Sequence, residues 1–171
     1  MDRNLERKLG QLETVLQQQI DAHDAMVTAM QRKRSALRAA KAGVVADSTL
    51  EENRCLQAIS ELEKQRLTLA ADLTLLLDPA AKQPMKLDAI ADRLDDPDRT
   101  RLLLLRLKLR KAMERVQHEA KVIKLATDTV LRNLTSMVQS ISAAATQTTT
   151  YSRGGGRPRQ PTGVSTFSMV A

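Results

Sequence analysis

The chain has 171 residues, which is enough for one domain, and a formal net charge of +7. It contains one tyrosine, one phenylalanine and no tryptophan, a composition that disfavours a globular α/β core and favours helices packed through aliphatic side chains. Cys55 is the single cysteine, so an internal disulfide is excluded, as is typical of a protein in a reducing cytosol. The basic charge permits anionic partners without requiring them.

Neither a leader nor a membrane span is indicated by the hydropathy pattern. The first eight residues have no apolar core, so they do not form a signal peptide. The longest leucine run, at residues 102–105, is far shorter than the roughly 20 residues that a membrane span needs. We therefore expect a cytoplasmic protein that does not insert into a membrane.

The first predicted helix covers about residues 2–42. Its apolar face consists of Leu5, Leu9, Leu12, Leu16, Ile20, His23, Val27, Met30 and Leu37. Gly43 is the expected C-cap. The last third carries the cations Arg32, Lys33, Arg34, Arg38 and Lys41. Cations suit a helix C-terminus, so we expect them to be solvated there, and the alternative is an anion-binding patch.

A second helix is predicted over residues 49–77 and a short third helix over residues 86–94. Ser48-Thr49-Leu50-Glu51 has the pattern of a capping box, and Asp78-Pro79 ends the second helix. The apolar positions of the second helix are Cys55, Leu56, Ile59, Leu62, Leu69, Leu73 and Leu76, with Arg66 interrupting them. Those of the short helix are Leu87, Ile90, Ala91 and Leu94.

A long helix is predicted over residues 98–147, beginning after Asp96-Pro97. Its apolar positions are Leu102, Leu105, Leu109, Met113, Val116, Ala120, Ile123, Val130, Leu134, Met137 and Ile141. This stripe is longer than the first two helices can cover, so we expect an exposed apolar patch at residues 130–141. Three consecutive polar residues stand at 117–119, so a helix broken at this point is the alternative to a continuous one.

Together these elements predict an all-α protein, an elongated antiparallel helical bundle or coiled coil over residues 1–147 with a long C-terminal helix. Residues 148–171 contain Arg153, Gly154-Gly155-Gly156, Arg157 and Arg159 and no acid. We expect this part to be a flexible, basic, disordered tail because it has too little apolar surface to bury.

The sequence gives no sign of catalysis. A di-metal helical bundle uses Glu-x-x-His pairs, and neither His23 nor His118 has a glutamate three residues before it. The chain also lacks a phosphate-binding loop and a cysteine pair, so we expect no enzyme activity, no cofactor and no metal. The basic run at residues 99–111 has six cations and no acid. We interpret it as the solvated flank of a core helix; a membrane-surface or nucleic-acid helix is the less favoured alternative, because no aromatic residue is interleaved.

Three segments carry a resemblance to a known family. Residues 51–69 are similar to a leucine-rich helix that ends in an arginine, residues 87–91 to a small linking helix, and the long last helix with Thr150-Tyr151-Ser152-Arg153-Gly154 to a C-terminal end. Over roughly residues 5–155 the chain thus resembles the FlgN family of flagellar export chaperones. The resemblance implies a cytosolic type III export chaperone that binds hook–filament junction proteins and delivers them to the flagellar export gate.

The same resemblance implies roles for particular residues. Together with Val130, the client-binding residues would be Leu134, Met137, Val138 and Ile141, and Tyr151 would contact the export gate. The alternative places the apolar residues in an internal core and makes Tyr151 an ordinary tail residue. Two other functions stay open: a structural or tethering coiled coil whose stripe forms a homo-oligomer, and, less favoured, a basic nucleic-acid-associated coiled coil.

Overall fold

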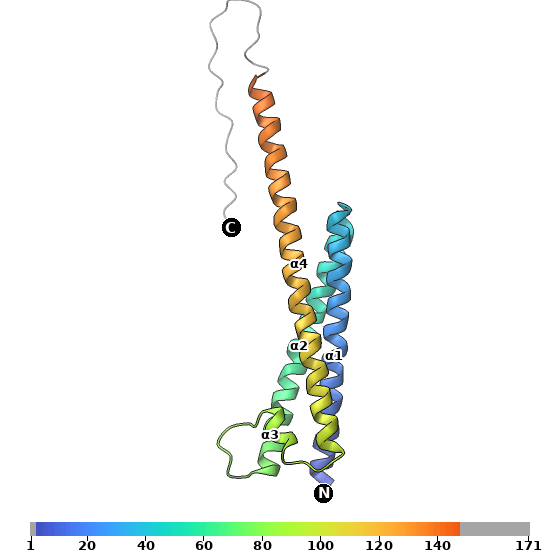
Figure 1. Cartoon of the computed structure of the whole chain (residues 1–171), viewed down its shortest axis with the longest axis vertical. Coiled ribbons are helices and arrows are strands. Elements are labelled where there is room, and N and C mark those ends of the chain that lie inside the picture. Colours follow the sequence, from blue (N-terminus) through green and yellow to red (C-terminus); the bar gives the residue numbers. More distant parts are fainter. Residues whose placement is uncertain (1–2, 148–171) are drawn as a thin grey trace, which may run out of the picture. The chain divides into compact units, whose positions relative to one another are not determined.

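The computed structural model describes residues 3–147, which form four helices and no strand. These are α1 (Arg3–Arg38), α2 (Ala42–Leu77), the short α3 (Leu87–Ala91) and the 50-residue α4 (Asp98–Gln147), shown in Figure 1. The prediction of an all-α helical bundle is therefore confirmed. The chain divides into two compact units, Met1–Leu131 and Arg132–Ala171, and we describe each by itself. The predicted tail at residues 148–171 lies outside the described residues.

α1 and α2 form an antiparallel hairpin in the first unit (Figure 1). The Lys8 ammonium lies 2.6 Å from the Asp72 carboxylate near one end of the pair. Towards the other end, Lys33 lies 2.9 Å from Glu52. Residue numbers thus rise on one helix as they fall on the other, as the sequence predicts for consecutive helices joined by a short turn.

The first part of α4 runs along α1 in the same direction. Arg101 reaches Glu13 at 3.4 Å, and Arg115 reaches Asp24 at 2.6 Å. α1 is more buried than its hairpin partner, with 12 buried residues of 36 against 5 of 36 in α2. This follows from its position, because α1 makes contacts with both α2 and α4.

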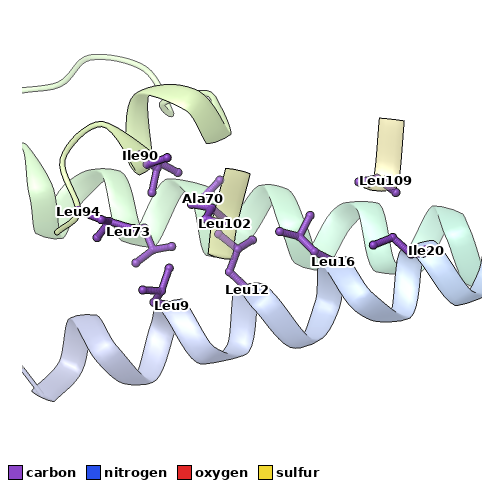
Figure 2. Packing of buried hydrophobic residues seen from close by; sticks show 11 residues of the cluster. Leu9, Leu12, Leu16, Ile20, Ala70, Leu73, Ile90, Leu94, Leu102 and Leu109 are labelled. Carbon is purple, nitrogen blue, oxygen red and sulfur yellow. The ribbon is translucent and has the colours of Figure 1, made fainter. Parts of the chain in front are cut away.

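The main core lies where α1, α2, α3 and the start of α4 meet (Figure 2). Its buried residues are Leu9, Leu12, Leu16, Ile20, Ala70, Leu73, Ile90, Ala91, Leu94, Leu102 and Leu109. A smaller cluster contains Met26, Met30, Cys55 and Ile123. Both clusters are built almost wholly from aliphatic and sulfur-containing side chains, which accounts for the near absence of aromatic residues in this part of the chain.

The turn between α1 and α2 does not use Gly43, so the predicted C-cap is wrong. α1 ends at Arg38, and Ala40 takes a left-handed backbone conformation with φ of 52°. The Lys41 N–H donates to the Ala36 carbonyl at 3.0 Å and the Ala40 N–H to the Leu37 carbonyl at 3.3 Å. These two hydrogen bonds make a Schellman motif with alanine where glycine is usual, so the glycine signal pointed to the wrong residue.

Replacing Ala40 with glycine is expected to stabilise the protein. An L-residue in the left-handed region carries a steric cost that glycine avoids, and we expect a net gain of about 0.5–1 kcal/mol after the larger unfolded-state entropy of glycine is subtracted. Thermal or urea unfolding of Ala40→Gly measures this gain. Unfolding at a lower temperature than the parent protein would contradict the assigned turn.

The predicted capping box at Ser48 is also wrong, because α2 already begins at Ala42. The Ser48 hydroxyl lies inside the helix and donates to the Val44 carbonyl at 2.7 Å, one turn back, instead of capping a helix start. Two predicted core positions of α2, Leu56 and Leu76, are 52% and 38% exposed. The predicted end of the helix before Asp78 is confirmed.

The buried seam of α4 differs from the predicted stripe at two positions. Met113 and Ala120 are exposed, whereas their neighbours Ala112 and Glu119 are buried. With the buried Leu102, Leu109 and Ile123 and the half-buried Leu105 and Val116, these two residues follow alternating steps of three and four, the spacing of a heptad seam. Glu119 thus belongs to the seam, and α4 continues through residues 117–119 without a break.

Candidate functional site

The register between α1 and α4 determines how far α1 can cover α4. The side-chain pairs that join them, Glu13 with Arg101, Asp24 with Arg115 and Arg34 with Glu119, are separated by 85 to 91 residues in sequence. The same offset places the last residue of α1, Arg38, level with residues 123–129 of α4. Ile123 is accordingly the last buried residue of α4 among those the structure describes.

Polar side chains join the end of α1 to both neighbouring helices. We call this group the polar clamp; it consists of Gln31, Lys33, Arg34, Glu52 and Glu119. The buried carboxylate of Glu119 lies 3.0 Å from the Arg34 guanidinium and accepts a weak hydrogen bond from the Gln31 amide at 3.4 Å. The adjacent Lys33 pairs with Glu52 of α2, and both of these side chains are largely buried. Lys33 and Arg34, two cations of the predicted basic end of α1, are therefore paired with carboxylates inside the first unit. For these two residues the structure supports neither a solvated helix end nor an anion-binding patch.

The end of α4 carries an exposed apolar face. Leu134, Met137, Val138 and Ile141 are 53%, 62%, 62% and 69% exposed. Their spacing of three and four residues places them on one side of α4, in line with the half-buried Val130 that precedes them. We call residues 130, 134, 137, 138 and 141 the terminal face. Within the second unit, residues 134, 137, 138 and 141 are exposed, and client binding stays a prediction.

The terminal face is nearly uncharged. Arg132 is the single charged residue in the sequence from 129 to 147. Leu125, 66% exposed, does not belong to the face, because nine residues separate it from Leu134 and nine steps of about 100° bring a side chain to the opposite side of the helix. The arrangement can therefore pack a partner through apolar contacts with little electrostatic contribution.

Most cations of the predicted basic run at residues 99–111 form ion pairs with carboxylates of the same chain. Four of its six cations lie within 3.4 Å of a carboxylate: Arg99 with Asp92, Arg101 with Glu13 and Asp98, Arg106 with Asp88, and Arg110 with Glu114. A nucleic-acid surface needs cations that are free to meet phosphates. The structure therefore supports the interpretation of this run as the flank of a core helix.

No metal or catalytic arrangement emerges from the histidines. His23 is buried, and its Nδ1 lies 2.8 Å from the Gln19 carbonyl, one turn back in α1. Within residues 3–147 no group of His, Cys, Asp or Glu side chains is placed to hold a metal ion, and no helix is long and apolar enough to cross a membrane. Cys55 is buried too, and burial, with Glu51 nearby, raises the pKa of its thiol.

Arg66, the residue that interrupts the α2 stripe, forms a bidentate pair with Glu63. It donates two hydrogen bonds to the Glu63 carboxylate at 2.6 and 2.7 Å, and these lower the pKa of Glu63 below its ordinary value of 4.5. The Gln19 amide adds a third hydrogen bond at 3.0 Å. The ionised form of Glu63 is therefore favoured in the folded state.

This pair gives the protein an acid-dependent contribution to stability. Because the folded pKa of Glu63 is depressed, its contribution is complete above about 4.5 and is lost as the pH falls through the folded pKa. Glu63 is 45% exposed, so solvent screening limits the effect to roughly 1 kcal/mol or less. Urea unfolding between about pH 6 and pH 3 should show a shallower loss of stability for Glu63→Gln than for the parent protein. Identical profiles would mean that the pair does not stabilise the fold.

Comparison with known families decides the class of the protein. The model of the FlgN family, described as FlgN protein, matches residues 1–159, which is nearly the whole chain. The chain belongs to the FlgN family. FlgN proteins are flagellar export chaperones, and the terminal face lies inside the matched region. Searches of curated proteins and of solved structures gave no significant match.

Tyr151, the predicted gate contact of this FlgN protein, lies within the region matched to the family but outside the described residues. The sequence signal for the terminal face, an apolar stripe longer than its partners, pointed to the side chains that the structure leaves exposed. The sequence analysis missed the clamp at Glu119, because a glutamate at a seam position gives no apolar signal.

Proposed function

We propose that this FlgN protein binds hook–filament junction proteins in the cytosol through its terminal face and delivers them to the flagellar type III export gate. The observation that carries the proposal is the exposed, nearly uncharged terminal face at the end of α4. A single helix with such a face presents side chains at the spacing that an amphipathic partner helix can complement. The client segment is accordingly a helix with its own apolar stripe.

Apolar burial at the terminal face would supply part of the free energy of client binding. Fully burying one Val, Leu, Ile or Met side chain contributes about 1.5–3 kcal/mol, so four of them contribute roughly 6–12 kcal/mol before the cost of association is subtracted. Because these contacts are apolar, we expect binding to be tolerant of salt.

Co-purification tests the proposal. The chaperone, tagged at its N-terminus, is co-expressed with the hook–filament junction proteins of the same organism and isolated at about 0.5 M salt, where the Debye length is roughly 4 Å. We expect a complex of defined stoichiometry with at least one junction protein. Recovery of the chaperone without any junction protein would overturn the proposal.

Delivery to the gate is assigned to Tyr151 on the family resemblance. Tyr151→Ala is expected to leave the client complex intact and to lower export of the client into the medium several-fold. Immunoblotting of culture supernatants against whole cells measures this ratio. Unchanged export would remove Tyr151 from the proposed pathway without affecting the client-binding claim.

A structural coiled coil is the second candidate function, because an apolar face on an exposed helix can also pair with a copy of itself. It predicts stable homo-oligomers that neither recruit a junction protein nor dissociate in its presence. The same co-purification, followed by measurement of mass, distinguishes the two functions.

A further inference from the structure

A groove of about 730 Å³ runs between α1 and α4 within the first unit, and we call it the α1–α4 groove. Its lining residues fall between positions 20 and 31 of α1 and between positions 108 and 119 of α4. At a rise of ~1.5 Å per residue each stretch is roughly 16 Å long, about three helical turns. The nearly buried side chains of Ile20 and Val27 form an aliphatic floor. A groove of this kind suits a third helix.

The α4 side of the groove carries a row of basic side chains. Lys108, Lys111, Arg115 and His118 line it and are exposed. They follow one another at steps of three and four residues, so they lie on one side of the helix. A partner helix with acidic residues at the same spacing would be electrostatically complementary to this row.

Two of these residues are the cations that the fold leaves uncompensated in the basic run at residues 99–111. The other four cations of the run pair with carboxylates of the chain. Lys108 and Lys111 form no ion pair with a carboxylate in residues 3–147, and both line the α1–α4 groove. The free positive charge of the run is therefore gathered at one place, next to an aliphatic floor.

The carboxylates that line the groove are already compensated by arginines. Asp24 lies 2.6 Å from Arg115, Glu114 lies 3.0 Å from Arg110, and Glu119 lies 3.0 Å from Arg34. An acidic residue of a partner would therefore meet free ammonium groups at Lys108 and Lys111. The groove selects an occupant that combines negative charge with an apolar side.

The aliphatic floor distinguishes between classes of anionic partner. A nucleic-acid strand has phosphates but would need an aromatic platform for its bases, and the chain has no Phe, Tyr or Trp before residue 151. A bilayer surface is broad, so its headgroups would not reach the floor of a groove between two helices. An amphipathic helix meets both requirements, with aliphatic side chains against Ile20 and Val27 and carboxylates towards α4. The alkyl stems of the two lysines extend the apolar contact.

We propose that the α1–α4 groove binds an acidic amphipathic helix of a second protein, with two of its carboxylates facing Lys108 and Lys111. This partner differs in chemistry from the client, because the terminal face is nearly uncharged and selects an apolar stripe. The two sites share no residue. Binding at the groove should weaken as salt rises, since the lysines are exposed, whereas client binding should tolerate salt.

A synthetic helical peptide tests the proposal. It carries leucines along one side and glutamates at i, i+3 and i+7 on the adjoining side, and its fluorescence anisotropy is followed as the full chain is added at about 0.1 M salt, where the Debye length is roughly 10 Å. Replacing both groove lysines, Lys108→Gln with Lys111→Gln, is expected to weaken binding at least about fivefold.

Lys121→Gln with Lys124→Gln is the matched control for this double variant. Both control lysines are exposed on α4, and neither lines the groove. The control removes the same charge from the same helix and should bind the peptide like the parent protein. Circular dichroism is expected to give both double variants the melting temperature of the parent, because all four side chains are exposed.

Exchanging the charges identifies the surfaces that meet. Lys108→Glu with Lys111→Glu is expected to lose the acidic peptide and to bind the same peptide with lysine in place of each glutamate. Serine in place of the leucines should abolish binding to the parent protein, because the aliphatic floor is then unmatched. The proposal is overturned if the acidic peptide does not bind, if glutamine in place of its glutamates leaves binding unchanged, or if the control lysines matter as much as Lys108 and Lys111.

Two other probes test the class of partner. A single-stranded oligonucleotide and vesicles containing an anionic phospholipid are each expected to bind more weakly than the peptide. Tighter binding of either one, with the same dependence on Lys108 and Lys111, would overturn the acidic helix as the occupant. Client co-purification is measured separately and should be unchanged by Lys108→Gln with Lys111→Gln, so the groove proposal can fail while client binding stands.

Discussion

Aspartate at Leu134 or Ile141 is expected to abolish capture of the client. These side chains are 53% and 69% exposed, so they are available to a partner and contribute little to the packing of the chain itself. A carboxylate placed against the apolar stripe of a client helix would be buried without a partner, which costs several kcal/mol. We expect affinity to fall by more than about a hundredfold, measured by co-purification and by isothermal titration with the purified client.

Leu125→Asp is the matched control for these two variants. Leu125 is as exposed as the terminal face but lies on the opposite side of α4, and it precedes Leu134 by nine residues on the same helix. It should bind client like the parent protein. Equal loss of binding in Leu125→Asp and Leu134→Asp would show that the effect comes from added charge and not from a particular side of the helix.

Truncation of Leu12 to alanine is expected to produce the largest loss of stability. Leu12 has no exposed surface and packs in the main core, where residues of α1, α2, α3 and α4 meet (Figure 2). Removing its methyl groups leaves a cavity there, and such changes cost about 2–5 kcal/mol. For a protein of this size the melting temperature should fall by roughly 5–15 °C, as measured by circular dichroism.

Substitutions in the core and on the terminal face are expected to change different properties, the core substitution the melting temperature and the terminal-face substitution client capture. Ile141→Ala, on the terminal face, should melt within about 2 °C of the parent protein because its side chain is 69% exposed. Leu12→Ala should still capture client at a temperature where it is folded. A melting temperature that falls as much for Ile141→Ala as for Leu12→Ala would mean that the terminal face is part of the folded core.

The sequence predicts the helices of this protein well because their patterns are long and uninterrupted. α4 begins where the proline before it predicts, and the apolar face of α1 is buried as expected. The failures are local. Ala40 turns the chain without a glycine, and the serine expected as a cap bonds inside a helix instead. Both depend on backbone geometry that residue type alone does not determine.

The seam of α4 was misplaced for a different reason. Hydrophobicity favours Met113 over Ala112 and Ala120 over Glu119, yet the structure buries the second residue of each pair. Ala112 is small enough to lie close to a neighbouring helix, and Glu119 is compensated by Arg34. Cross-helix partners of this kind are visible only after the chain has folded. The displaced Met113 lines a groove between α2 and α4.

The position of the terminal face could be predicted because it depends on the lengths of the helices and not on particular side-chain contacts. α1 has too few residues to accompany α4 beyond about residue 129, and this follows from the helix bounds and the offset between the helices. What binds the face depends on a second molecule, which one chain's sequence does not encode. The family supplies the class of that molecule, and the exposed side chains supply its physical requirements.

Hydrogen–deuterium exchange of this FlgN protein with and without a junction protein tests the central claim most directly. Amides at residues 130–141 should exchange fast in the chaperone without client, because no buried side chain holds that part of α4 in place. With the client bound, protection should rise there, while the amides of the core around Leu12 and Leu16 keep their rates. Protection that appears elsewhere, with residues 130–141 unchanged, would contradict client binding at the terminal face.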